Sequence, residues 1–249
     1  MKKITSVFGL IIRSSIFRIL ITLILLGVAE LFIFYRRLSS AVSVEYLLPN
    51  AGMTPLEALV KNSGFTLLFA LAFVAVTVFL CMTGTQYSSR SGYTLARLSI
   101  TEKQIFFCQT IYNITVYIIL WIYQVVLLFI ASGLYVSLSP AEYIGEQTVF
   151  LAFYRNDFMH SMLPLSDVLV WIKNIAVAIG LGFAAAEFPY NQRGGRFGAT
   201  IVGYSLYTIV FFVRGIGSVW NSIVFIGISI VIAIKPALGY LEDEEDEKN

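Results

Sequence analysis

Six long apolar blocks, separated by short polar segments, set the pattern of this chain. They cover residues 16–35, 64–84, 105–132, 168–188, 197–213 and 218–237. A transmembrane helix needs about 20 apolar residues to cross roughly 30 Å of hydrocarbon, and most of the blocks have that length. We therefore expect an all-α polytopic membrane protein with about six transmembrane helices. Because the fifth block is short, five spans with a re-entrant hairpin is the competing arrangement.

Composition supports the same class and excludes an ordinary soluble enzyme. Of the 249 residues, 58% are hydrophobic and 13% are charged, whereas a soluble domain is usually about 25% charged. The net charge of +2 is too small to indicate nucleic-acid binding. The last residues form an acidic block, so we expect a single transmembrane domain over residues 1–241 and a disordered acidic tail over 242–249.

The positions of Lys and Arg predict the orientation, because positively charged loops stay on the cytoplasmic side. With the N-terminus inside, most basic residues lie in or beside cytoplasmic segments. These are Lys2, Lys3, Arg13, Arg18, Arg90, Arg97, Lys103, Arg193, Arg196 and Lys235. The basic residues on the extracytoplasmic side are then Arg36, Arg37, Lys61, Arg155 and Arg214. An even number of spans then places both termini in the cytoplasm of a multi-pass plasma-membrane protein, which we expect to be bacterial.

The first residues show helical periodicity before the first block. Ile4, Val7, Phe8, Ile11 and Ile12 recur at the spacing of one helix face. This pattern predicts an amphipathic helix that lies in the interface of the cytoplasmic leaflet before the chain turns into the first span. A frayed basic tail is the alternative interpretation.

Ionisable residues within apolar blocks are candidates for function, because burial of charge in lipid is costly. Glu30, Lys173 and Asn174 form the candidate intramembrane polar site, while Glu187 and Arg214 lie near block ends. For Glu30 and the residues near block ends, we expect the side chains to reach toward the headgroups. For Lys173 two interpretations stay open: it faces a polar cavity or another helix, or it extends to the outer headgroups.

The segment that joins the second and third blocks combines basic and apolar residues. It runs from residue 84 to residue 104 and contains Arg90, Leu95, Arg97, Leu98, Ile100 and Lys103. Thr101 with Gln104 three residues later is the signature of a capping box, so we expect the third span to begin there. A short helix of this kind could dock in a groove on a cytoplasmic partner, or the segment could be a solvated loop.

This segment resembles the loop between the second and third spans of type-2 permeases of ATP-binding-cassette transporters. That family has a phrase of the form Thr-Leu-x-x-Leu-Pro-x-Ser/Thr, and residues 94–101 read Thr-Leu-Ala-Arg-Leu-Ser-Ile-Thr. Ser99 stands where the family commonly has proline. The resemblance implies an ATPase-coupling segment formed by Tyr93, Leu95, Arg97, Leu98, Ile100 and Thr101. It also implies an export permease that pairs with a second copy or a homologous permease.

The resemblance further implies that a separate ATPase subunit binds ATP and Mg²⁺, so that the chain itself binds no cofactor. The chain contains no Gly-x-x-x-x-Gly-Lys-Ser/Thr phosphate-binding loop and no Gly-x-Ser-x-Gly elbow. Membrane lipid is the other expected partner, and no nucleic acid is expected. A secondary transporter or channel, and an intramembrane enzyme, are the competing function classes.

Overall fold

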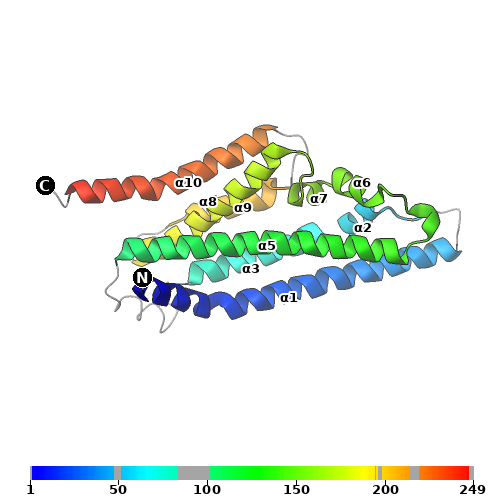
Figure 1. The fold of residues 1–249 in the computed structure, drawn as a ribbon, viewed down its shortest axis with the longest axis horizontal. Helices are drawn as coiled ribbons and strands as arrows, with labels where there is room; N and C mark the ends of the chain where they lie inside the picture. Colours follow the sequence, from blue (N-terminus) through cyan, green and yellow to red (C-terminus); the bar gives the residue numbers. More distant parts are fainter. Residues whose placement is uncertain are drawn as a thin grey trace.

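The computed structural model describes residues 2–47, 52–83, 101–193, 195, 198–213 and 219–246, with side chains in all of these except 2–4 and 237–246. Their regular structure is helical and contains no β-strand. The elements are α1 (Lys2–Leu47), α2 (Leu56–Asn62), α3 (Phe65–Met82), α5 (Glu102–Leu138), η1 (Ala141–Tyr143), α6 (Thr148–Arg155), α7 (Asp157–Met162), α8 (Val168–Arg193), α9 (Thr200–Phe211) and α10 (Val219–Asp246). Long helices lie side by side and the short ones gather toward one end (Figure 1). The expected all-α class is therefore confirmed.

Five helices are long and apolar enough to cross a membrane. The candidate spans are Thr5–Leu47, Phe65–Met82, Glu102–Leu138, Val168–Arg193 and Val219–Pro236. The helix that corresponds to the fifth apolar block, α9, has 12 residues. At 1.5 Å per residue it is about 18 Å long, which is short of a hydrocarbon core of roughly 30 Å. These spans are those of a polytopic membrane protein.

Polar contacts show that α1 and α5 run in the same direction. The hydroxyl groups of Ser15 and Tyr112 lie 2.7 Å apart. Farther along both helices, Gln124 Nε2 donates to Glu30 Oε2 at 2.9 Å. The residue numbers of the two contacts increase along α1 and α5 in the same sense. Figure 1 shows the two ribbons running side by side from the same end of the bundle.

By contrast, α3 runs antiparallel to α5. Thr77 and Tyr117 have hydroxyl oxygens 3.0 Å apart, and Thr83, just beyond α3, contacts Gln109 near the start of α5. Thr83 and Thr101, the described residues on either side of positions 84–100, therefore lie at the end of the bundle where α1 begins.

The last third of the chain crosses back and forth beside α8. Lys173, near the start of α8, donates to the backbone oxygen of Phe212, just beyond α9. Glu187, near the end of α8, pairs with Lys235 of α10. The chain from residue 198 to Phe212 therefore returns to the level of Lys173, a rise of about 21 Å if wholly helical. Then α10 runs back to the level of Glu187.

Two apolar clusters hold the helices together. One joins the long helices and includes Val76, Ala185 and Phe225. The other lies at the opposite end of the bundle from Thr83 and Thr101, where Phe34 of α1 and Met159 of α7 are fully buried. Burial of an apolar side chain contributes roughly 1.5–3 kcal/mol relative to water, although between spans the gain is mainly close packing.

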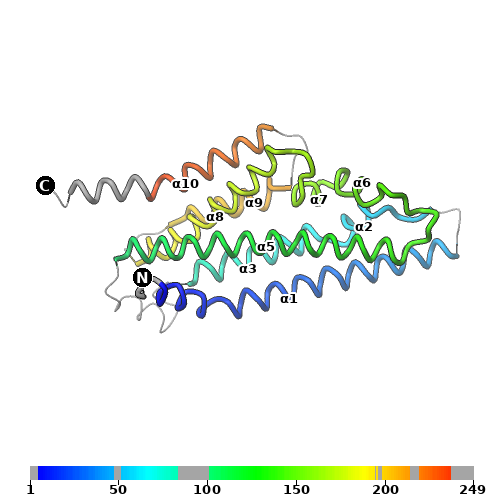
Figure 2. Tube along the Cα trace, viewed as in Figure 1, coloured from blue at the N-terminus to red at the C-terminus, as the bar shows by residue number. Residues whose placement is uncertain are grey.

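The first helix differs from the expected interfacial helix followed by a turn. It is continuous from Lys2 to Leu47, and Figure 2 traces it without a second helix at its start. Val7 and Ile11 belong to the larger apolar cluster, and Phe8 and Ile12 pack against it. Part of the predicted apolar face therefore packs on the protein, with Val7 and Ile11 buried and Phe8 and Ile12 partly exposed. The side chain of Ile4 lies outside the described residues.

The backbone of α10 is helical to Asp246. The sequence predicted a disordered tail over residues 242–249. In the described part of that stretch, residues 242–246, the backbone is helical.

Candidate functional site

The ATPase-coupling segment falls mostly within residues 84–100, which lie outside the described residues. Those positions are Tyr93, Leu95, Arg97, Leu98 and Ile100. The last member, Thr101, is described, and its side chain accepts from the backbone N–H of Gln104 at 3.4 Å. This is the N-cap of α5 that the sequence predicted, and it ends the segment at a defined point.

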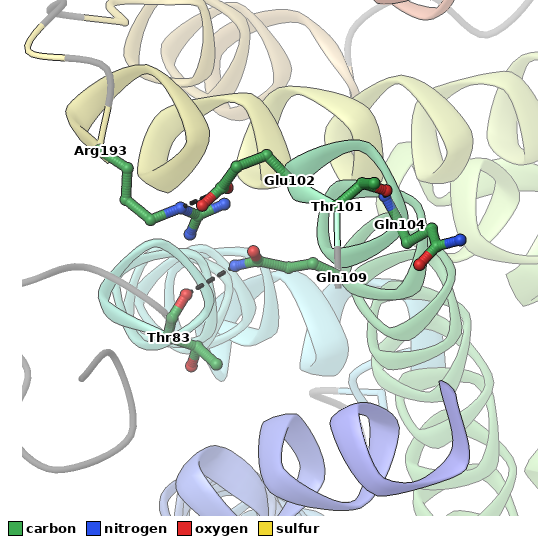
Figure 3. Close-up of polar contacts among 6 residues, drawn as sticks. All are labelled: Thr83, Thr101, Glu102, Gln104, Gln109 and Arg193. Atoms are coloured by element: carbon green, nitrogen blue, oxygen red, sulfur yellow. Dashed lines mark hydrogen bonds and ion pairs between the residues drawn. The ribbon is translucent and has the colours of Figure 1, made fainter. Parts of the chain in front are cut away.

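The entry to this segment is attached to α5 by a buried hydrogen bond. Gln109 Nε2 donates to the backbone oxygen of Thr83 at 2.6 Å (Figure 3). Thr83 also donates its hydroxyl to the backbone oxygen of Phe79, one turn earlier, at 2.8 Å. Gln109 and Thr83 are both buried. A buried hydrogen bond that loses one partner leaves the other unsatisfied, at a cost of about 1–3 kcal/mol, so the end of α3 is held to α5.

The exit from the segment is attached to α8 by an ion pair. Arg193 Nε lies 2.9 Å from Glu102 Oε2, and Figure 3 shows the two side chains pointing toward one another from α8 and α5. Glu102 is partly exposed, so this ion pair adds little to the stability of the fold. Its main effect is to fix the position of the start of α5 relative to the end of α8. Both ends of the segment 84–100 are thus tied to neighbouring long helices. We call the three ties, which are the Thr83–Gln109 bond, the Thr101 cap and the Glu102–Arg193 pair, the junction.

Glu30 is buried between α1 and α5 rather than reaching to the headgroups. Its exposed fraction is 0%, and its Oε2 accepts from Gln124 Nε2 at 2.9 Å. The second oxygen, Oε1, has no hydrogen-bond partner among the described residues. The expectation that this carboxyl reaches toward the headgroups was wrong, because the helix turns it toward α5. In hydrocarbon such a bond favours one rotation of α1 against α5.

Lys173 faces another helix. Its side chain is 4% exposed, and Nζ donates to the backbone oxygen of Phe212 at 3.4 Å. The same nitrogen lies 4.7 Å from the centroid of the Phe212 ring, within the range of a cation–π contact. Of the two interpretations left open, the structure matches the one in which Lys173 faces a neighbouring helix.

Asn174 points to a different neighbour from Lys173. Its Nδ2 donates to the backbone oxygen of Ser161 at 2.8 Å, and its Oδ1 has no partner among the described residues. Since Glu30 contacts α5 instead, the structure does not bring the three predicted residues into one polar site.

Glu187 also departs from the expectation that it reaches toward the headgroups. It is buried, and Lys235 Nζ of α10 lies 2.6 Å from its Oε1. Asn191, one turn along α8, donates to the same oxygen at 3.3 Å. The pair joins α8 to α10 near the end of the bundle that holds the junction. Arg214 lies outside the described residues.

A cavity of about 70 Å³ lies among α3, α5, α7, α8 and α9. Its walls include Phe69, Tyr117, Trp121, Asn174, Thr208 and Phe212. The space is that of about two water molecules, and most of the lining is apolar. Asn174 and Thr208 are polar members of this lining. Sequence analysis missed this cavity because its lining comes from five helices and no local pattern marks it.

No family model, curated protein or solved structure matches the chain. The function is therefore inferred from the residues and their arrangement. Two features stand out within the described part of the chain. These are the junction at the ends of segment 84–100 and the cavity among five helices.

Proposed function

We propose that this chain is the membrane-spanning permease subunit of an ATP-driven exporter of the ATP-binding-cassette type. A separate subunit binds ATP and Mg²⁺ and hydrolyses ATP. The observation that carries the proposal is the junction, which ties both ends of the segment 84–100 to the long helices. The segment itself contains the phrase, residues 94–101, that resembles the coupling loop of type-2 permeases.

The junction supports a mechanical role for the segment. A displacement of the segment by the ATPase reaches α3 through Thr83, α5 through Thr101 and Gln109, and α8 through the contact between Glu102 and Arg193. Rigid helices that share ties at one end tilt together. A loop attached by flexible linkers would absorb the same displacement without moving the spans.

A six-span arrangement with both termini in the cytoplasm is part of the proposal. The course of residues 198–213, which return from the end of α8 to the level of Lys173, supports a sixth crossing. The Lys and Arg distribution supports the cytoplasmic side for the junction. Permease copies then assemble as a homodimer or with a homologous permease, and the substrate passes between or beside the spans that line the cavity.

One feature favours the alternative, a secondary transporter that is not driven by ATP. Glu30 is a fully buried carboxyl group with one oxygen that lacks a hydrogen-bond partner among the described residues. Proton-driven transporters use intramembrane carboxyl groups in this way. In the part of the chain that the structure describes, Glu30 contacts no second carboxyl that would continue a relay.

The test is co-purification of ATPase activity with the affinity-tagged chain from its native membranes. Replacement of Leu95 and Leu98 together by aspartate removes two apolar contacts, each worth roughly 1.5–3 kcal/mol when buried at an interface. Association with the ATPase should weaken by well over about tenfold. Tyr46→Asp with Leu47→Asp is the matched control, because both side chains are exposed at the end of α1 away from the junction.

We expect the control to retain coupled ATP hydrolysis while the variant of Leu95 and Leu98 loses it. Both should remain monodisperse in detergent, since the control change is confined to the exposed last two residues of α1 and the other change lies between the second and third apolar blocks. If no ATPase activity co-purifies with the tagged wild-type chain, the secondary transporter would be favoured. Full coupled activity in the variant of Leu95 and Leu98 would show that this segment is not the transmission element.

A further inference from the structure

A groove of about 510 Å³ runs along the outer surface of the bundle between α1 and α3. Because the helices are antiparallel, Arg18 and Phe79 lie at one end of the groove, and Ala29 and Leu68 lie at the other. Each helix contributes a stretch of about 16 Å to its length. This is close to half of a hydrocarbon core of roughly 30 Å, the depth of one leaflet.

The wall of the groove is apolar except at the end that holds Arg18. Ile21, Leu25 and Leu71 line it and are each more than half exposed. Ala75 of α3 also lines the groove, and the groove is deep at this point because the alanine side chain is small. A surface of this composition, open along one side of a membrane protein, is suited to an acyl chain.

Arg18 is placed at the edge of the hydrocarbon. Between Arg18 and Arg36 one stretch of α1 rises about 27 Å, close to the thickness of the hydrocarbon core. Large exposed apolar side chains, among them Ile24, Val28 and Phe32, occupy the outward side of that stretch. The Arg18 guanidinium therefore lies at the level of the lipid phosphates.

The charge of Arg18 is not neutralised by the described part of the protein. Its guanidinium carbon lies 6.0 Å from the centroid of the Phe79 ring. No carboxylate of the described residues lies within 4.0 Å of it. The segment 84–100, which follows α3 at this end, contains no Asp or Glu. A net negative ligand at this level would complement the groove.

We propose that the groove between α1 and α3 binds an anionic phospholipid, with one acyl chain along Leu25 and Ala75 and the phosphate at Arg18. A second copy of this chain is the less suitable occupant. A two-fold contact through this face would place the two Arg18 side chains at the same depth and close together, and like charges repel. The proposal does not depend on whether the chain works with an ATPase.

The test measures lipid that stays bound to the purified chain. The protein is reconstituted in vesicles of equal parts phosphatidylglycerol and phosphatidylcholine, extracted with mild detergent, and examined by native mass spectrometry. Arg18→Gln should lower tightly bound phosphatidylglycerol by about fivefold, the factor for one basic side chain near an anionic surface. Arg18→Lys should retain most of the bound lipid. Arg13→Gln is the matched control, since Arg13 is exposed on the same helix but does not line the groove.

A second variant tests the apolar part of the site independently of charge. Ala75→Leu fills the groove and should lower bound phosphatidylglycerol although Arg18 is intact. Equal losses from Arg18→Gln and Arg13→Gln, or equal retention of the two lipids by the wild-type chain, would overturn the proposal. So would near-complete disulfide formation between chains that carry cysteine at Leu25, because a second copy would then occupy the groove.

Discussion

The helices α5 and α8 approach each other closely at Gly182. A methyl group added at this position should push the two helices apart. The ideal Cβ of an alanine at position 182 would overlap the Ile114 side chain. It would also lie 3.0 Å from the backbone nitrogen of Ile114 and 3.1 Å from its Cα. Backbone atoms cannot rotate away as the end of a side chain can. We therefore predict that Gly182→Ala destabilises the bundle.

The size of the effect follows from two opposing terms. Replacement of glycine by alanine inside a helix gains about 0.5–1 kcal/mol, because the unfolded chain loses conformational freedom. Overpacking against a neighbouring helix costs about 1–3 kcal/mol. Gly133→Ala in α5 is the matched control, because its Cβ would meet no atom within 4 Å. The helical gain cancels in the comparison, so the two variants should differ by about 1–3 kcal/mol in the free energy of unfolding.

Unfolding in a series of mixed micelles with increasing denaturing detergent gives the comparison. Trp121 of α5 and Trp171 of α8 have ring centroids 5.6 Å apart, so tryptophan fluorescence reports the separation of these two helices. Gly182→Ala should unfold at a lower detergent fraction than both Gly133→Ala and the wild type. If Gly182→Ala and Gly133→Ala share one midpoint, the close approach does not limit packing and the reasoning is refuted.

Two further predictions concern orientation and the buried polar pair. In a chain whose native cysteines are replaced by serine, a cysteine at Tyr154, which is 56% exposed, should react with a membrane-impermeant thiol reagent in intact cells. A cysteine at Arg13, exposed at the junction end of α1, should react only after the cells are opened, and the opposite labelling would reverse the orientation. Gln124→Leu removes the donor to Glu30 and should lower the free energy of unfolding by roughly 1–2 kcal/mol. Glu30→Gln keeps an acceptor and should stay near the wild type; a Gln124→Leu variant that is equally stable would show that the bond contributes nothing.

Features that depend on neighbours along the chain could be predicted from the sequence. The second apolar block, residues 64–84, corresponds to α3 at Phe65–Met82 within two residues. The start of α5 after Thr101 follows from a hydrogen bond between residues three apart. Thr54 and Glu57, three residues apart, form a second capping-box signature in the sequence, and α2 begins beside it at Leu56. It begins without a side-chain cap, because Pro55 occupies the N-cap position and its side chain has no hydrogen-bond acceptor.

The partners of the buried polar residues were decided only by the tertiary structure. Gln124 is 94 positions from Glu30 in the chain, and Lys173 meets Phe212 across 39 positions. A hydropathy pattern predicts that a helix crosses the membrane, but it does not set the rotation of that helix about its axis or its shift against the next. Those two quantities depend on packing such as that of Gly182 on Ile114. They decide which side chains face one another, which face lipid, and where the groove and the cavity lie.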